Sequence, residues 1–203
     1  MSLLAETLVC RRGETTVFRD LSFAVPAGGA LLLVGRNGSG KSSLLRLCAG
    51  LIAPAGGRLA WQGRAQSEDA DAWRGGVAYV GHLDAVKAAF SVVENLSVWA
   101  SLAGGAGDVA GAMAAMDIAG LRDVPARYLS AGQRRRVALA RLALSPAPIW
   151  LLDEPAVSLD ADGVAALGRL IAGRRATGGV VLAATHGDIS IPDAATLRLG
   201  GAP

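Results

Sequence analysis

The 203-residue chain is expected to form an α/β domain with a parallel-sheet core, an N-terminal antiparallel β subdomain and a small inserted α-helical subdomain. After residue 30, continuously apolar segments alternate with helical patterns, which is typical of a parallel sheet covered on both faces. The earlier apolar segments follow one another without helices, so antiparallel pairing is expected for them. One domain over residues 1–203, with the helical subdomain at 83–131, fits this length.

The elements follow from apolar runs bounded by glycine and proline. Gly28-Gly29 forms the turn that leads into the first core strand. The first helix after that strand stops at Gly50 and Pro54. Buried strands are expected where the runs are fully apolar, as in GVAYVG and GVVLAAT. Strands are predicted at 7–12, 16–25, 30–35, 56–64, 76–81, 149–154 and 179–185. Helices are predicted at 42–51, 91–104, 108–120, 131–145 and 161–176, the second and third being separated by GGAG.

Composition excludes several classes of protein. Cys10 and Cys48 give neither a disulfide framework nor a metal-binding spacing, and small buried thiols are expected. The longest apolar runs are far shorter than the roughly 20 residues of a spanning helix, and no signal peptide is predicted, so the chain is expected to be soluble by itself. A net charge of +3 favours an arginine-rich solvated surface over a nucleic-acid partner.

A glycine-rich loop stands between a predicted strand and a predicted helix. Lys41 and Lys87 are the two lysines among 20 basic residues, and Lys41 ends this loop. The loop matches G-x-x-x-x-G-K-[ST] in the context that a P-loop NTPase (RecA-like) core requires, and it predicts binding of ATP phosphates. Its residues are Gly35, Arg36, Asn37, Gly38, Ser39, Gly40, Lys41 and Ser42. A compact ammonium fits between β- and γ-phosphates better than a planar guanidinium, and Ser42 is a candidate Mg²⁺ ligand. The alternative is an ordinary glycine-rich turn.

Two acids follow the apolar run IWLL at residues 149–152. Asp153 has the position of the strand-end aspartate that helps P-loop nucleotidases hold Mg²⁺. Glu154 is placed to act as the general base toward water. The alternative is a strand that reaches the surface and ends in solvated acids.

Further motifs give the chain a family resemblance. LSAGQ, with Ser130, Ala131, Gly132 and Gln133, opens the arginine-bearing helix. After the strand predicted at 149–154 come SLD, at Ser158, Leu159 and Asp160, and THGD, with His186. With the phosphate loop these resemble, in order and over nearly the whole length, the signature, D-loop and switch histidine of ABC transporter ATP-binding subunits. The resemblance implies that two subunits meet head to tail, the signature of one closing over the ATP of the other. It also implies that Glu154 and His186 are catalytic.

A narrower resemblance is to the haem-exporter ATPase of the cytochrome c maturation system. It is carried by segments such as YVGH, LSAGQRRRVALARL, IWLLDEPAVSLDADGV and GGVVLAATH. It implies a Mg-dependent ATPase that works with an integral membrane permease and other cytochrome c maturation proteins, peripherally at the cytoplasmic face of the bacterial inner membrane. No nucleic-acid partner is expected. An ABC transporter for another substrate, or a soluble ABC ATPase acting on nucleic acid, remains the alternative.

Two residues depart from the family pattern, and a run of arginines follows the signature. His82 stands where most ABC subunits have the Q-loop glutamine, and it either replaces that residue or only marks the loop. Arg12 is nearest to the usual adenine-stacking aromatic, and either it contacts adenine or it is solvated. The arginines at 134–136 are expected to be solvated or at subunit contacts.

Overall fold

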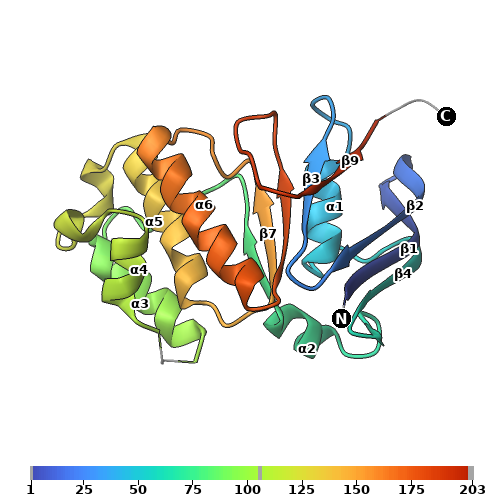
Figure 1. Cartoon of the computed structure of the whole chain (residues 1–203), viewed down its shortest axis with the longest axis horizontal. Coiled ribbons are helices and arrows are strands. Elements are labelled where there is room, and N and C mark those ends of the chain that lie inside the picture. The colour runs from blue at the N-terminus through green and yellow to red at the C-terminus, as the bar shows by residue number, and fades with distance from the viewer. Residues whose placement is uncertain (1, 105–106, 201–203) are drawn as a thin grey trace.

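The computed structural model describes residues 2–104 and 107–200. Two sheets and a group of helices are arranged in layers, with the antiparallel sheet at one side and α3–α5 at the other (Figure 1). Gly105 and Ala106, inside the GGAG link between two predicted helices, lie outside the described residues.

The antiparallel sheet has the order β2-β1-β4-β5, and the parallel sheet has the order β6-β7-β8-β3-β9. The strands are β1 Ser2–Arg12, β2 Thr15–Pro26, β3 Ala30–Val34, β4 Gly56–Trp61, β5 Arg64–Ala65, β6 Val77–Val80, β7 Ile149–Asp153, β8 Val180–Ala184 and β9 Ala195–Arg198. The helices are α1 Lys41–Cys48, α2 Ala70–Gly75, α3 Val92–Leu102, α4 Val109–Ala115, α5 Ala131–Leu144 and α6 Ala161–Ala176, with 3-10 turns at Ala119–Leu121 and Ala126–Tyr128.

The sequence predicted the two-sheet α/β fold, and the arrangement confirms it. Strand β9 and helix α2 are among the short elements that were not predicted. Strand β9 adds to the parallel sheet beside β3, although three of its four residues are exposed. Helix α2 has six residues and buries only Trp73.

Alternate side chains of the central strands enter different cores, which is why these strands are apolar throughout. Leu151 and Leu182 pack on the face that carries α1 and the antiparallel sheet. Trp150 and Leu152 pack on the other face, against residues of α5 and α6. The prediction of a buried strand at 76–81 is wrong except at Val80, because β6 is an edge strand and its other residues are half-buried.

Because the strands are parallel, the polar segments that follow them lie at the same edge of the sheet. The carboxyl ends of β3, β7 and β8 lie side by side, because Ala184 of β8 is paired with Asp153 of β7 and with Leu33 of β3. The segments that follow these strands are those with the phosphate loop, the two acids and His186. Ligands in such sheets bind outside the carboxyl ends of the strands.

Candidate functional site

The glycine-rich loop, residues 35–42, joins β3 to α1 and curls around its own lysine. Lys41 is 6% exposed, and its Nζ donates to the carbonyl oxygens of Gly35 (2.8 Å) and Arg36 (3.2 Å). The loop therefore presents a buried ammonium beside the first amides of α1, which is a phosphate-binding arrangement.

Two of the loop's glycines are required by close contacts. A Cβ on Gly35 would lie 2.4 Å from the carbonyl oxygen of Leu199 and 2.7 Å from Ser39 Oγ. Gly40 precedes α1 with a φ of 101°, and a Cβ there would lie 2.7 Å from Val17 Cγ1. The loop is thus packed between β2 and the segment after β9.

Two oxygen ligands for a hard cation meet next to the loop. Ser42 Oγ donates to Asp153 Oδ1 at 3.0 Å, although 111 residues separate them in sequence. Asp153 is 2% exposed at the end of β7. A buried carboxylate and a hydroxyl beside a phosphate-binding loop are the donor set that Mg²⁺ takes in nucleotide sites, so these residues fit the ion.

Glu154 and His186 form a second polar pair, because each follows one of two neighbouring strands, β7 and β8. Glu154 Oε1 and His186 Nε2 are 3.2 Å apart, and the side chains are 30% and 46% exposed. The Glu154 backbone is left-handed, with a φ of 50°, which is a strained conformation for a residue with a side chain. This pair can hold and move a proton beside the phosphate loop.

The signature residues lie at the beginning of α5, and Ser130 caps this helix. The Gln133 amide donates to Ser130 Oγ (3.1 Å), and the Ser130 amide donates to Gln133 Oε1 (2.9 Å). A Cβ on Gly132 would lie only 2.6 Å from the carbonyl oxygen of Ser158, so the helix and the D-loop (residues 158–160) touch where only glycine fits. Ala131 is exposed on the first turn.

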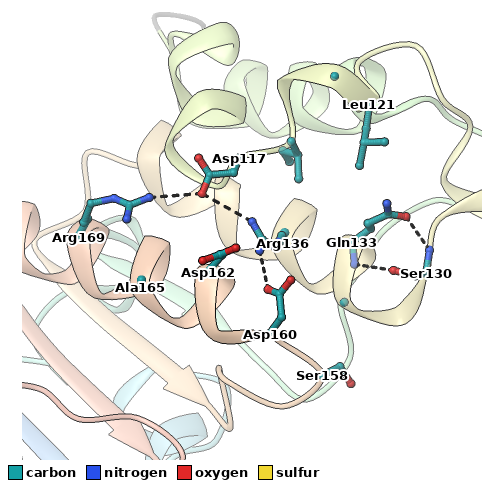
Figure 2. A pocket seen from close by; sticks show the side chains of 13 residues that line it. Asp117, Leu121, Ser130, Gln133, Arg136, Ser158, Asp160, Asp162, Ala165 and Arg169 are labelled. Carbon is teal, nitrogen blue, oxygen red and sulfur yellow. Dashed lines mark hydrogen bonds and ion pairs between the residues drawn. The ribbon is translucent and has the colours of Figure 1, made fainter.

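The D-loop ends where Asp160 caps α6 and pairs with Arg136. These residues line a cavity of about 790 Å³ between the beginnings of α5 and α6 and the segment 117–121 (Figure 2). The Arg136 guanidinium and the Gly163 amide hold the pKa of Asp160 below its ordinary value. Ser158 has a φ of 67°, and Leu159 packs against the core on this side.

The prediction that the arginines at 134–136 are solvated or at subunit contacts is wrong for two of them. Arg135 is 4% exposed and Arg136 is 9% exposed. Arg136 donates to the Met116 carbonyl oxygen and pairs with Asp160, and carbonyl oxygens of other elements accept from Arg135. Acceptors from distant segments satisfy both guanidinium groups, and sequence spacing alone does not show them.

The two residues that depart from the family pattern lie at the surface. His82 is exposed in the loop after β6, and Arg12 is exposed at the end of β1, where it pairs with Thr15 of β2. Among the described residues, neither makes a hydrogen bond or an ion pair with Glu154 or His186. Tyr79 was not predicted: its hydroxyl donates to Asp153 Oδ2 at 3.5 Å. Its position one residue before the end of β6, the strand beside β7, is the signal that could have found it.

Comparison with known proteins assigns the family. A family model described as ABC transporter matches residues 18–157. The chain belongs to the ABC transporter family. This ABC ATPase is 53% identical over 195 residues to the "Cytochrome c biogenesis ATP-binding export protein CcmA" of Rhodospirillum rubrum, covering 96% of this chain and 84% of the relative. It is 49% identical to the protein of that name from Paramagnetospirillum magneticum, covering 96% and 92%.

Solved structures of ABC ATPases share its fold. An ABC transporter ATP-binding protein from Pyrococcus furiosus has a TM-score of 0.84 at 24% identity, covering 98% of each chain. A dimeric ATP-binding cassette bound to ADP and phosphate has a TM-score of 0.78 at 21% identity, covering 91% of this chain and 88% of that one. The P-loop NTPase fold expected from the glycine-rich loop is confirmed.

Proposed function

We propose that this ABC ATPase is the ATP-hydrolysing subunit of an export complex in cytochrome c biogenesis and that it energises haem export or release to a haem chaperone. The observation that carries the proposal is identity of 40–53% over nearly the whole chain with proteins that share one name, "Cytochrome c biogenesis ATP-binding export protein CcmA". ATP hydrolysis follows from the family, and haem follows from the narrower resemblance.

Each residue of the site has a proposed part in hydrolysis. The loop amides and Lys41 bind the β- and γ-phosphates, supported by the buried ammonium within the loop. Ser42 and Asp153 hold Mg²⁺, and the bound ion would neutralise part of the negative charge of the phosphates. Glu154 accepts the proton of the attacking water, and His186 orients that water and the γ-phosphate, supported by their 3.2 Å contact.

A second copy of the chain is proposed to complete the site. The beginning of α5, with the signature, lies on one side of α6, and the loop between β3 and α1 lies on the other (Figure 1). One copy therefore cannot bring its own Ser130 and Gly132 onto its own phosphate loop without a large rearrangement. A head-to-tail dimer joins the two halves, with the exposed D-loop side between them. For Arg12 and His82 we propose the roles of adenine contact and Q-loop residue, respectively.

The membrane pathway is proposed to come from other polypeptides. Within residues 2–104 and 107–200, every helix is too short or too polar to cross a bilayer. An integral permease subunit would hold this ATPase at the cytoplasmic face of the inner membrane. The helical segment 83–131 is proposed as a subdomain that contributes to this contact.

Recovery of the complex from membranes tests the proposal. The tagged full-length chain is purified from solubilised membranes, and the integral proteins recovered with it are identified by mass spectrometry. We expect membrane proteins of cytochrome c biogenesis, and we expect cells carrying only Glu154→Gln to lose haem-stained c-type cytochromes. Recovery with an unrelated permease, together with normal cytochromes, would overturn the haem assignment and leave an ABC transporter for another substrate. Strong, salt-sensitive binding of DNA or RNA would favour a nucleic-acid role.

A further inference from the structure

Arg135 lies in the first half of α5 and donates hydrogen bonds to two separate segments of the chain, residues 81–84 and 153–155. It is 4% exposed. Its guanidinium donates to carbonyl oxygens of Asp153 (3.0 Å), Glu154 (2.8 Å) and Pro155 (3.2 Å) and to that of Gly81 (3.0 Å). It also pairs with Asp84 at 3.2 Å. One side chain thus joins the helix that bears the signature, the end of β7 and the loop after β6.

Most of these acceptors are backbone carbonyl oxygens, which sets Arg135 apart from an ordinary ion-paired arginine. The three at residues 153–155 are consecutive and belong to the segment that carries the two acids of the site. Only arginine presents five donors in one plane, so it can serve several acceptors at fixed angles. A buried charge with a single partly exposed acidic partner is costly unless its donors are used in this way.

The contact with Glu154 bears on the strained backbone there. The Glu154 amide donates to the Ala184 carbonyl oxygen at 3.0 Å, and the Glu154 carbonyl oxygen accepts from Arg135 at 2.8 Å. The peptide groups on both sides of this residue are therefore held while its φ is 50°. A left-handed conformation of a residue with a side chain persists only where its surroundings fix it. The conformation directs the carboxylate to its 3.2 Å contact with His186.

We propose that Arg135 is a positioning residue for ATP hydrolysis. Its hydrogen bonds fix the backbone that orients the Glu154 carboxylate, and they connect this backbone to the loop at 81–84. The inference rests on the proposed role of Glu154 as the general base. Arg135 does not touch the reacting atoms in this scheme. Its loss would leave ATP binding at the phosphate loop in place and would misdirect the base. A displacement of about 1 Å at such a group costs on the order of 100-fold in rate.

Arg141 is a matched control on the same helix. Its guanidinium donates to the Tyr79 carbonyl oxygen at 2.8 Å and stacks on Trp99 at 4.6 Å. Burial lowers the pKa of Arg141 to about 10, so it too is a charge held away from water. Its hydrogen bonds and its ring contact lie at β6, Asp84 and α3, whereas the hydrogen bonds of Arg135 reach the segment with the acids of the site. Removal of either arginine disturbs packing, whereas only removal of Arg135 frees the Glu154 backbone.

The experiment compares Arg135→Gln, Arg135→Lys and Arg141→Gln in the full-length chain, purified with its membrane partner. ATP affinity is measured with a fluorescent ATP analogue, and kcat is measured by phosphate release. For Arg135→Gln we expect kcat to fall about 10- to 100-fold while the ATP Kd stays within about two-fold of wild type. Arg135→Lys should be intermediate, because an ammonium reaches fewer of the carbonyl oxygens, and Arg141→Gln should keep kcat within about three-fold.

A double substitution separates positioning from a general loss of structure. Arg135→Gln added to Glu154→Gln should slow hydrolysis little further, since the group that it aims is already gone. Equal losses of kcat in Arg135→Gln and Arg141→Gln, a parallel loss of ATP affinity, or fully multiplicative effects in the double variant would overturn the inference. If Arg135→Gln does not fold, Arg135→Lys carries the same comparison. If Glu154→Gln alone hydrolyses at the wild-type rate, the proposed base is wrong. If Glu154→Gln is slow and Arg135→Gln is normal, only the positioning role fails.

Discussion

Replacing Gly132 by alanine tests the contact between the signature and the D-loop. The added methyl carbon would lie 2.6 Å from the Ser158 carbonyl oxygen, about 0.8 Å inside the 3.4 Å at which such contacts become ordinary. The neighbour is backbone, so the D-loop or the first turn of α5 must move. Overpacking of this kind costs roughly 1–3 kcal/mol. Alanine also favours a helix over glycine by about 1 kcal/mol, which opposes the clash.

Gly173→Ala isolates the clash. This position is inside α6, and outside its own helix none of the described atoms lies within 4 Å of a Cβ there. Gly173→Ala should raise the free energy of unfolding by up to about 1 kcal/mol, and Gly132→Ala should fall below it by roughly 1–3 kcal/mol. Urea unfolding followed by circular dichroism measures both, and hydrolysis by Gly132→Ala should fall while ATP affinity is kept. Equal stabilisation by the two alanines would refute the reasoning.

Four further outcomes are expected. Lys41→Ala should lose Mg-ATPase activity by at least about 100-fold, and turnover undiminished by this change would contradict the phosphate-binding role. Glu154→Gln should keep ATP binding, slow hydrolysis by about 10²- to 10⁴-fold and accumulate a closed dimer in size-exclusion chromatography with ATP; wild-type turnover would remove the base. Cys48, whose pKa burial raises to about 12, should resist thiol reagents at pH 8 in the native state and react after denaturation, so rapid labelling of the native protein would argue against its burial. The pKa of Asp160 is lower in the folded protein than its ordinary value of 3.8. The contribution of its ionised carboxylate to stability is therefore present above pH 3.8, and it is lost as the pH falls through the pKa of the folded state. Asp160→Asn should accordingly lower the melting temperature at pH 7, and this difference from wild type should shrink as the pH drops below 3.8; a pH-independent difference would argue against the ion pair.

The core of the fold and the motifs were predictable because their signals are local. Strands such as β7 and β8 bury both faces and are therefore apolar throughout, a pattern that the sequence displays directly. The phosphate loop is one continuous segment, so its glycines and lysine appear together as one motif in the sequence. The roles assigned to the site residues stay predictions, although the fold brings Ser42 to Asp153 and Glu154 to His186.

The rest depended on partners far away in sequence. Strand β9 has mostly exposed side chains, so it has no apolar run, and its pairing with β3 is made by backbone groups. The burial of Arg135 could not be inferred from an RRR run, because its acceptors are carbonyl oxygens 18 to 54 residues away. The misassigned burial of β6 has a similar origin, since position at the edge of a sheet is a property of strand order.

Helix α1 stands between the two sheets, and this has a consequence for how the chain can be divided. Leu44, Leu45 and Leu47 belong to one cluster with Leu3 and Leu8 of β1 and with residues of the parallel sheet. A protein trimmed to begin at β3 would keep the whole phosphate loop and every acid of the site. It would, however, expose the leucine side chains of α1 that pack against β1 to water. Such a fragment should aggregate rather than bind nucleotide. The hairpin of β1 and β2 is therefore needed to cover the helix that follows the phosphate loop, and it cannot be removed without loss of the nucleotide site.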